Sequence, residues 1–118
     1  MLGESIDLTS GSQMRDFIYL DDVVKAVCMS VSAPLRRSYH NFDIGTGKLT
    51  SIKDFVMQLN TICGSKSALN FGALQDREGE LINSFANLKM NTELGWKFDT
   101  DIKSGLKKII SDYKYKHG

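Results

Sequence analysis

The chain has 118 residues, a net charge of +1 and a charged share of 25%, so its composition gives no case for a nucleic-acid or membrane-surface protein. This is the length of one domain, 1–118, and a compact domain of that size buries about two thirds of the surface of its unfolded chain. No apolar run approaches the length of a membrane span. Cys28 and Cys63 lack the spacing of a metal or redox motif, and we expect buried thiols in a reducing cytoplasm.

Two short strands are predicted at the start of the chain. Residues 6–9 and 15–19 have strand character, and the polar, glycine-containing segment 10–13 between them indicates a turn, hence a β-hairpin. Period-two alternation places Arg15 and two aromatic side chains on one face of the second strand. An arginine in front of a helix is a plausible anion-holding group, and a structural pair between Arg15 and an aspartate at a sheet edge is the alternative.

A helix is predicted to follow, from about Asp22 to Ser32. Asp21 and Asp22 supply carboxylates where the first helical N–H groups lack partners. The helix ends before Pro34, because proline disfavours the helical conformation of the residue that precedes it. Its apolar residues recur at helical spacing, and they are Val23, Val24, Val27 and Val31.

The middle of the chain predicts a strand, a tight turn and a second helix. Residues 39–44 form the strand, and Gly45-Thr46-Gly47 closes it. A strand before Gly-x-Gly and a helix after it resemble the start of a dinucleotide-binding loop, but the third glycine is replaced by Thr50. A structural turn is therefore the better interpretation. We expect Ser51 to be the N-cap residue at the start of the second helix, and Gly64 to end this helix.

The last part of the chain predicts a strand and two helices. The strand covers residues 68–71, and a short helix runs from Asn87 to Gly95, after which Trp96 packs. The final helix starts at Asp99 or Thr100. Its buried stripe is expected to consist of Ile102, Leu106, Ile109, Ile110 and Tyr113.

Several blocks of sequence, in this order, resemble the second half of extended short-chain dehydrogenases/reductases, the NAD(P)-dependent nucleotide-sugar epimerases, dehydratases and reductases. Each block alone is weakly specific, whereas the ordered set covers nearly the whole chain. The blocks are Arg-Asp-Phe-Ile-Tyr-Leu-Asp-Asp-Val-Val from Arg15, Tyr-His-Asn-Phe-Asp-Ile-Gly-Thr-Gly-Lys from Tyr39, Ser-Ile-Lys-Asp-Phe from Ser51, Phe-Gly-Ala-Leu from Phe71 with Arg-Glu-Gly-Glu from Arg77, and Glu-Leu-Gly-Trp from Glu93.

The resemblance implies a small mixed α/β fold, the C-terminal, substrate-binding portion of such an enzyme without its glycine-rich Rossmann half. The family's catalytic Tyr-x-x-x-Lys and its glycine-rich loop have no counterpart here. No catalytic, cofactor-binding or metal-binding residue is therefore expected in this chain. NAD or NADP would bind the complete enzyme, and the isolated chain would be inactive.

Two arginines carry the expected substrate contact. In the family, the arginines of the Arg-Asp-Phe segment and of the late Arg-x-Gly segment hold the diphosphate of the nucleotide sugar, and these positions match Arg15 and Arg77. A guanidinium group suits this task because it stays charged and can bind phosphate through two parallel hydrogen bonds. Glu78 departs from the pattern by adding an acid beside Arg77. The segment from Phe71 is most similar to enzymes of surface-polysaccharide synthesis that act on CDP- or dTDP-linked sugars.

A second hypothesis is a non-catalytic binding or assembly module that kept the substrate-domain fold. In the family, the first helix and the strand 39–44 pack onto the Rossmann domain, so the resemblance implies that this missing domain is their partner. Without that domain, the helix valines together with Phe42 and Ile44 would form an exposed apolar patch, and we expect self-association through it.

Overall fold

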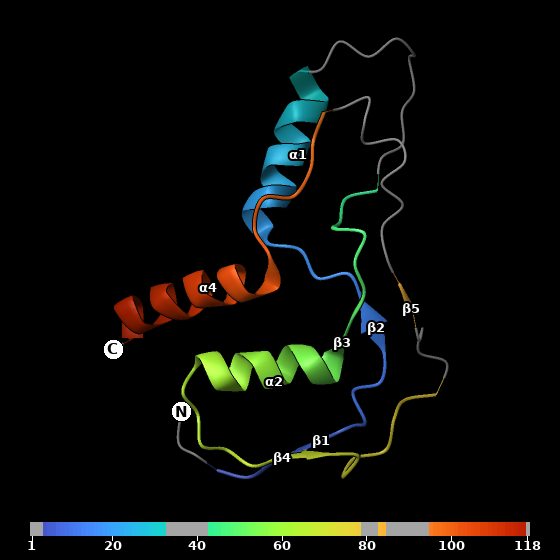
Figure 1. Cartoon of the computed structure of the whole chain (residues 1–118), viewed down its shortest axis with the longest axis vertical. Helices are drawn as coiled ribbons and strands as arrows, with labels where there is room; N and C mark the ends of the chain where they lie inside the picture. The colour runs from blue at the N-terminus through green and yellow to red at the C-terminus, as the bar shows by residue number, and fades with distance from the viewer. Residues whose placement is uncertain (1–3, 33–42, 79–82, 85–94, 118) are drawn as a thin grey trace.

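The structure is a computed structural model, and it describes residues 4–32, 43–78, 83–84 and 95–117. Within these residues it contains two small sheets and three helices in a mixed α/β arrangement (Figure 1), which confirms the predicted fold class. The strands are β1 (Ile6–Leu8), β2 (Met14–Arg15), β3 (Thr50–Ser51), β4 (Leu69–Phe71) and β5 (Asn83–Ser84), and the helices are α1 (Leu20–Ser32), α2 (Ile52–Ile62) and α4 (Ile102–His117).

The first sheet joins β1 to β4 in parallel, with Ile6 opposite Leu69. The predicted hairpin between the first two strands is wrong. At the start of α2, the backbone N–H of Lys53 donates to the carbonyl of Gly11 at 2.9 Å, and that of Ile52 donates to the carbonyl of Gln13 at 3.0 Å. The segment after β1 therefore runs along the start of α2 instead of reversing, and a strand about sixty residues later becomes the partner of β1.

The second sheet has the order β3-β2-β5, with β3 antiparallel and β5 parallel to the central strand β2. The predicted strand 15–19 is thus shortened to Met14–Arg15. After Arg15, the carboxylate of Asp16 accepts a hydrogen bond from the backbone N–H of Thr46. The carbonyl of Tyr19 accepts a hydrogen bond from the backbone N–H of Asp22 at 3.1 Å, at the start of the following helix. Phe17 instead stacks on Phe55 of α2, with ring centroids 4.0 Å apart.

Helix α1 confirms the predicted helix, and one of the two acidic residues in its first turn joins the helix to a distant segment. Asp22 is buried, and its carboxylate accepts a hydrogen bond from the backbone N–H of Thr100 at 3.0 Å. The backbone carbonyl of Asp22 accepts a second bond from the indole Nε1 of Trp96, also at 3.0 Å. These two bonds fix the start of α1 to the segment that leads into α4.

The buried core is small and centres on this junction. Ala26 of α1 is fully buried and Trp96 is 4% exposed. This confirms the predicted packing of Trp96. Four half-buried apolar side chains surround the pair, and they are Ile18, Met29, Ile44 and Phe98.

The other face of α1 has no cover from the described residues. Val24 and Val27 are half exposed, and Val31 is 83% exposed. Cys28 lies on the same helix and is exposed, so the expectation of a buried thiol is wrong for Cys28. The expectation that Ile44 joins this exposed face is also wrong, because Ile44 packs against the Ala26–Trp96 core.

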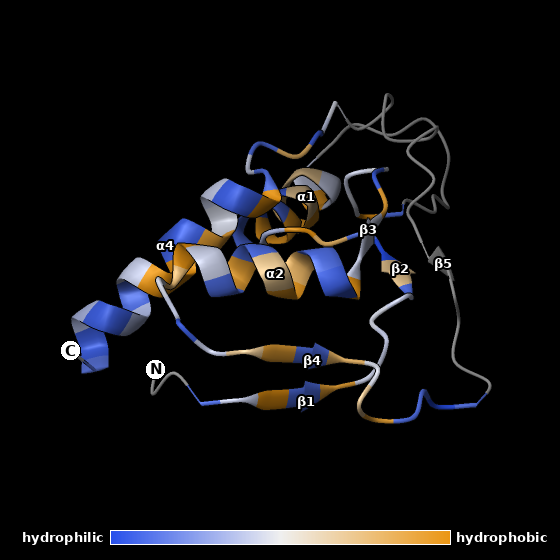
Figure 2. Cartoon of the chain, turned by 60° about the horizontal axis from the view of Figure 1, so that its bottom comes forward, coloured by the Kyte–Doolittle hydropathy of each residue, from blue (hydrophilic) through white to orange (hydrophobic). Residues whose placement is uncertain are grey.

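Helix α2 has the termini that local signals predict. The Ser51 hydroxyl accepts a hydrogen bond from the backbone N–H of Asp54 at 3.0 Å, which confirms the N-cap. Gly64 follows the last turn in the left-handed conformation, at φ +67°. Figure 2 shows α2 alongside the β1–β4 pair, and the apolar side chains Val56, Leu59, Ile6 and Leu69 line a shared cavity there of about 410 Å³.

Helix α4 starts two or three residues later than predicted, and Asp101 caps it. The Asp101 carboxylate accepts a hydrogen bond from the backbone N–H of Ser104 at 2.8 Å, and this bond lowers the pKa of Asp101. Leu106 and Ile110 of the predicted stripe are buried. Ile109 and Tyr113 are more than half exposed, and Figure 1 shows that the C-terminal end of α4 projects beyond the end of α2.

The chain is more open than a compact domain of its mass. Its radius of gyration is 17.5 Å, whereas about 13.5 Å is typical of a compact domain of this length. Its accessible surface is 8707 Å², against about 6400 Å² for a compact monomer of the same mass. The expectation that two thirds of the surface is buried is therefore wrong.

Two predicted elements lie largely outside the described residues. Of the strand 39–44, only Asp43 and Ile44 are described, and they are not in a strand. Of the helix 87–95, only Gly95 is described. Among the residues that the structure does describe, no helix has the length and apolar character needed to cross a membrane.

Candidate functional site

The first predicted site residue, Arg15, lies on the central strand of the second sheet. It stands opposite Thr50 of β3 on one side and Ser84 of β5 on the other. Its side chain is half-buried, and its Nη1 donates a hydrogen bond to the carbonyl of Met14 at 2.8 Å. A guanidinium has five N–H donors, and this bond uses one of them.

The turn Gly45-Thr46-Gly47 holds a carboxylate of the protein itself. The backbone N–H groups of Thr46 and Gly47 donate to Asp16, at 2.9 Å to Oδ1 and 2.8 Å to Oδ2 respectively. The Thr46 hydroxyl adds a bond of 2.6 Å to Oδ1. Successive N–H groups of this kind form an anion-binding concavity. Because Asp16 fills it, the structural interpretation of this turn is favoured over phosphate binding.

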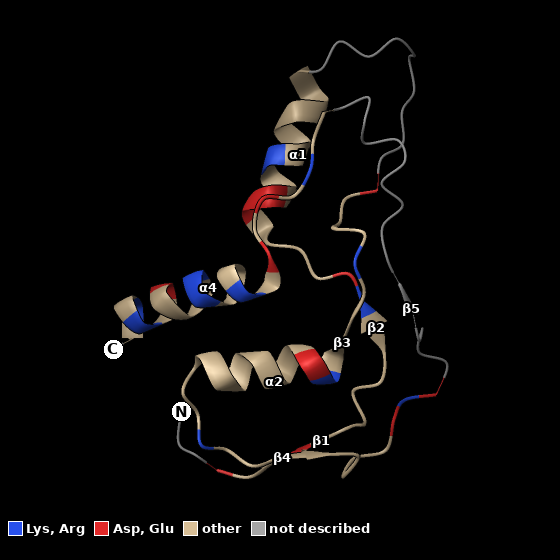
Figure 3. Ribbon diagram, viewed as in Figure 1, with Lys and Arg blue, Asp and Glu red and all other residues tan. Residues whose placement is uncertain are grey.

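The second predicted site residue, Arg77, lies on an exposed loop after β4. The preceding residue, Asp76, anchors this loop to the segment after β1. Its carboxylate accepts hydrogen bonds from the hydroxyl and the backbone N–H of Ser10, at 2.7 and 2.9 Å. Both bonds lower the pKa of Asp76, and the bond from the Ser10 hydroxyl has the larger effect. The carboxylate is therefore charged at neutral pH. The ribbon in Figure 3 shows acidic and basic residues next to each other along this loop.

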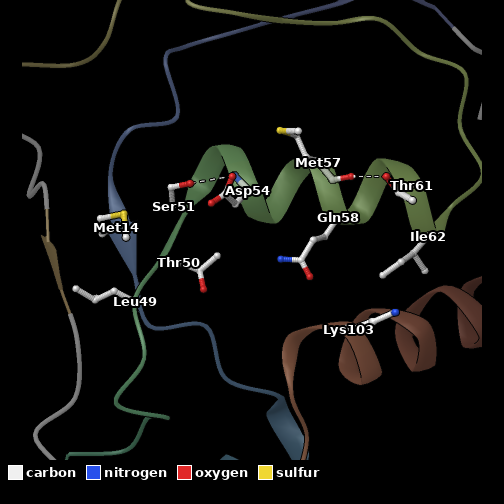
Figure 4. Close-up of a pocket in the computed structure, with 10 residues that line it drawn as sticks. All are labelled: Met14, Leu49, Thr50, Ser51, Asp54, Met57, Gln58, Thr61, Ile62 and Lys103. Carbon is white, nitrogen blue, oxygen red and sulfur yellow. Dashed lines mark hydrogen bonds between the residues drawn. The ribbon is translucent and has the colours of Figure 1, made fainter.

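The largest cavity described, about 670 Å³, lies elsewhere, between β2, β3, α2 and the start of α4 (Figure 4). Gln58 and Ile62 of α2 point toward α4, which contributes Lys103. Thr50 and Asp54 add polar atoms at the other end, while Arg15 and Arg77 are not among the lining residues. A volume of this size suits a small-molecule ligand. Sequence reasoning missed this site because its polar residues come from three separate elements and form no motif.

Tyr19 has the wrong environment for a catalytic base. Desolvation raises the pKa of Tyr19, and the carboxylates of Asp21, Asp112 and Asp22 raise it further. A tyrosine that accepts a proton near neutral pH needs a shift in the opposite direction.

Comparison with known proteins identifies relatives that are much longer than this chain. No family model matches. The chain is 36% identical over 108 residues to CDP-abequose synthase of Salmonella muenchen, a match that covers 92% of this chain and 37% of that protein. The chain thus spans little more than a third of the length of this curated relative.

Two solved structures share the fold. The UDP-glucose 4-epimerase of Thermotoga maritima, solved with UDP-glucose, matches 98% of this chain and 37% of its own, with a TM-score of 0.85 and 25% identity. MoeE5, in complex with UDP-glucuronic acid and NAD, matches 95% of this chain and 37% of its own, with a TM-score of 0.81 and 25% identity. The chain belongs to the nucleotide-sugar epimerases, dehydratases and reductases of the extended short-chain dehydrogenase/reductase family, and its extent is consistent with a C-terminal portion of such an enzyme.

Proposed function

We propose that this chain is the substrate-binding part of an NAD(P)-dependent enzyme that epimerises, dehydrates or reduces a nucleoside-diphosphate sugar by hydride transfer, and that the chain is inactive in isolation. The observation that carries this proposal is the match along almost the whole chain to a CDP-sugar enzyme, joined to the fold of an epimerase solved with UDP-glucose. A CDP- or UDP-linked sugar destined for a surface polysaccharide is the substrate class that these relatives favour. The proposal includes a reducing cytoplasm, where two free thiols persist.

The cofactor belongs to the remainder of the complete enzyme in this proposal. The occupied turn supports this part of the proposal, because the segment that most resembles a dinucleotide loop already donates its N–H groups to Asp16. The domain that binds the cofactor would cover the exposed valines of α1. The open shape of the chain supports such a partner, since its surface exceeds that of a compact monomer.

Arg15 and Arg77 are the residues that we assign to the diphosphate. Arg15 is held on the middle strand of a sheet, so its backbone position is fixed from both sides. Arg77 is exposed on a loop that Asp76 anchors. A diphosphate offers several oxygens, and two guanidinium groups can share them through charge-assisted hydrogen bonds.

Arg15→Ala and Arg77→Ala should each weaken nucleotide-sugar binding by the complete enzyme. Loss of a charge-assisted hydrogen bond costs about 1.5–3 kcal/mol, or about ten- to a hundredfold in the dissociation constant. Substitution by Lys should restore part of the affinity, because the charge returns without the planar fork. Calorimetric titration with CDP and UDP measures the effect.

Lys66→Ala is the matched control, because Lys66 is an exposed cation on the loop after α2, away from both arginines in sequence. It should bind the nucleotides as the unmodified enzyme does. Unchanged binding and turnover in both arginine variants would refute the assignment.

The alternative function, a non-catalytic binding or assembly module, has one observation in its favour. The largest cavity described is lined by neither arginine. A module of this kind would bind a ligand there without catalysing hydride transfer. Turnover of a nucleotide sugar by the complete protein would exclude this alternative.

The isolated chain should self-associate through the exposed face of α1, formed by Val24, Val27 and Val31. A contiguous apolar patch is rarely left exposed on a soluble monomer, and a stable interface buries about 1000 Å² or more in total. Light scattering at micromolar concentration should give a mass above 13.2 kDa, the mass of one chain.

Val27→Lys should shift the scattering mass toward that of one chain, since it places a charge in the middle of the patch. Ile109→Lys is the control, because Ile109 is equally exposed, at 54%, but lies on α4. A mass near 13.2 kDa for the unmodified chain would instead indicate a monomer whose helices close over the patch.

A further inference from the structure

The loop that carries Arg77 is fastened to the segment after β1 by bonds that continue the β1–β4 pairing. The backbone N–H of Leu74 donates to the carbonyl of Leu8, and that of Gly72 donates to the carbonyl of Thr9, both at 3.0 Å. The series ends where the Asp76 carboxylate accepts two bonds from Ser10. Arg77 is the next residue, so its backbone starts from a fixed point.

Ser10 is also joined to the strand that carries Arg15. Only four residues separate Ser10 from Arg15. Within them, the carbonyls of Gly11 and Gln13 accept backbone bonds from Lys53 and Ile52 at the start of α2. The backbone between Ser10 and β2 is therefore held by hydrogen bonds to α2, and Ser10 itself is held by Asp76.

We propose that Asp76 is a positioning residue for diphosphate binding: by holding Ser10, it fixes the Arg77 loop relative to β2, so that Arg77 and Arg15 can contact the same diphosphate. This inference rests on the proposed function, because it presupposes that both arginines bind phosphate. Asp76 itself does not touch the ligand in this scheme.

Considered as a charge alone, the Asp76 carboxylate should weaken diphosphate binding, whereas a positioning residue should strengthen it. A carboxylate beside an anion-binding arginine repels the anion, so its removal should strengthen binding if charge were its only contribution. A positioning role predicts weaker binding on removal, because the Arg77 loop loses its anchor. The sign of the change therefore separates the two roles.

Glu78 provides the matched control. It flanks Arg77 on the other side, is exposed and carries the same charge as Asp76. Glu78→Ala removes that charge without removing the bonds to Ser10. It should leave the affinity for an anion unchanged or raise it.

The experiment measures the dissociation constants of CDP and UDP for the complete enzyme by calorimetry. Asp76→Ala should weaken binding about two- to tenfold, the range expected for hydrogen bonds of ordinary net strength. Asp76→Asn, which has nearly the same shape and keeps one acceptor oxygen, and Ser10→Ala, which keeps the backbone donor, should give smaller losses. In an Arg77→Ala background, Asp76→Ala should have no further effect, because no second guanidinium remains to be positioned.

The outcomes separate this inference from the function on which it rests. If Arg77→Ala weakens binding while Asp76→Ala behaves like Glu78→Ala, the positioning role is overturned and the proposed function stands. If Asp76→Ala weakens binding equally with and without Arg77, its effect does not act through Arg77, and the role is again overturned. If neither Arg15→Ala nor Arg77→Ala changes binding, the diphosphate assignment fails and the positioning role fails with it. Circular dichroism of each variant checks that its fold is intact.

Discussion

Trp96→Ala should unfold the chain or reduce its free energy of unfolding by about 3–5 kcal/mol, the usual cost of truncating a buried Trp to Ala. Trp96 is 4% exposed and packs on Ala26, with which it forms a buried cluster. Its indole also donates to the carbonyl of Asp22, so truncation leaves that buried acceptor without this donor. A natural domain has about 5–15 kcal/mol in total, and a core this small leaves little reserve.

Urea unfolding followed by circular dichroism measures this loss, and two variants test its cause. Trp96→Phe keeps most of the ring volume but removes the N–H donor, so it should cost less than Trp96→Ala. Tyr115→Ala truncates an aromatic residue that is 92% exposed on α4, and it should change stability by at most about 0.5 kcal/mol. Equal effects for Trp96→Ala and Tyr115→Ala would show that the Ala26–Trp96 core does not hold the fold.

The parts of this fold that sequence predicts well are those with local causes. The start and end of α2 follow from Ser51 and Gly64, and each acts on groups within three or four residues of itself. Helix α1 likewise follows from valine spacing and from Pro34. Such signals need no knowledge of the rest of the chain.

The contacts that sequence did not predict are between segments far apart in the chain. Nothing near Ile6 indicates that its strand pairs with Leu69 rather than with the next strand. The carboxylate of Asp22 looks like a helix cap in the sequence, yet it accepts a bond from Thr100, 78 positions later. Loop closure over such distances depends on the whole topology, which a local pattern does not contain.

The candidate site also contains residues with local sequence signals and residues that only the fold brings together. Arg15 and Arg77 could be proposed from the sequence because each lies in a contiguous motif, and their role stays a prediction. The cavity between α2 and α4, by contrast, combines Thr50, Gln58 and Lys103 from separate elements. The anchoring role of Asp76 is visible only once its bonds to Ser10, 66 positions earlier, are known.

The segment that joins Ser10 to Arg15 depends on a glycine, and Gly11→Ala should be the second most damaging substitution. Gly11 has φ +67°, and a Cβ placed on it would lie 2.8 Å from the backbone nitrogen of Lys53. That nitrogen donates to the carbonyl of Gly11 at 2.9 Å, so neither backbone can move without breaking the bond. Left-handed strain of about 1–2 kcal/mol and an overpacking cost of about 1–3 kcal/mol should add, giving a loss of about 2–5 kcal/mol.

Gly64→Ala isolates the two causes, because Gly64 has the same φ of +67° but a Cβ placed on it would meet no atom within 4 Å. It should cost the strain alone, about 1–2 kcal/mol. In urea unfolding, Gly11→Ala should therefore be less stable than Gly64→Ala by about 1–3 kcal/mol. Equal losses would mean that the segment after β1 relaxes away from α2. Such freedom would also loosen the connection between Asp76 and Arg15, so this comparison of stabilities bears on how firmly the two arginines are held together.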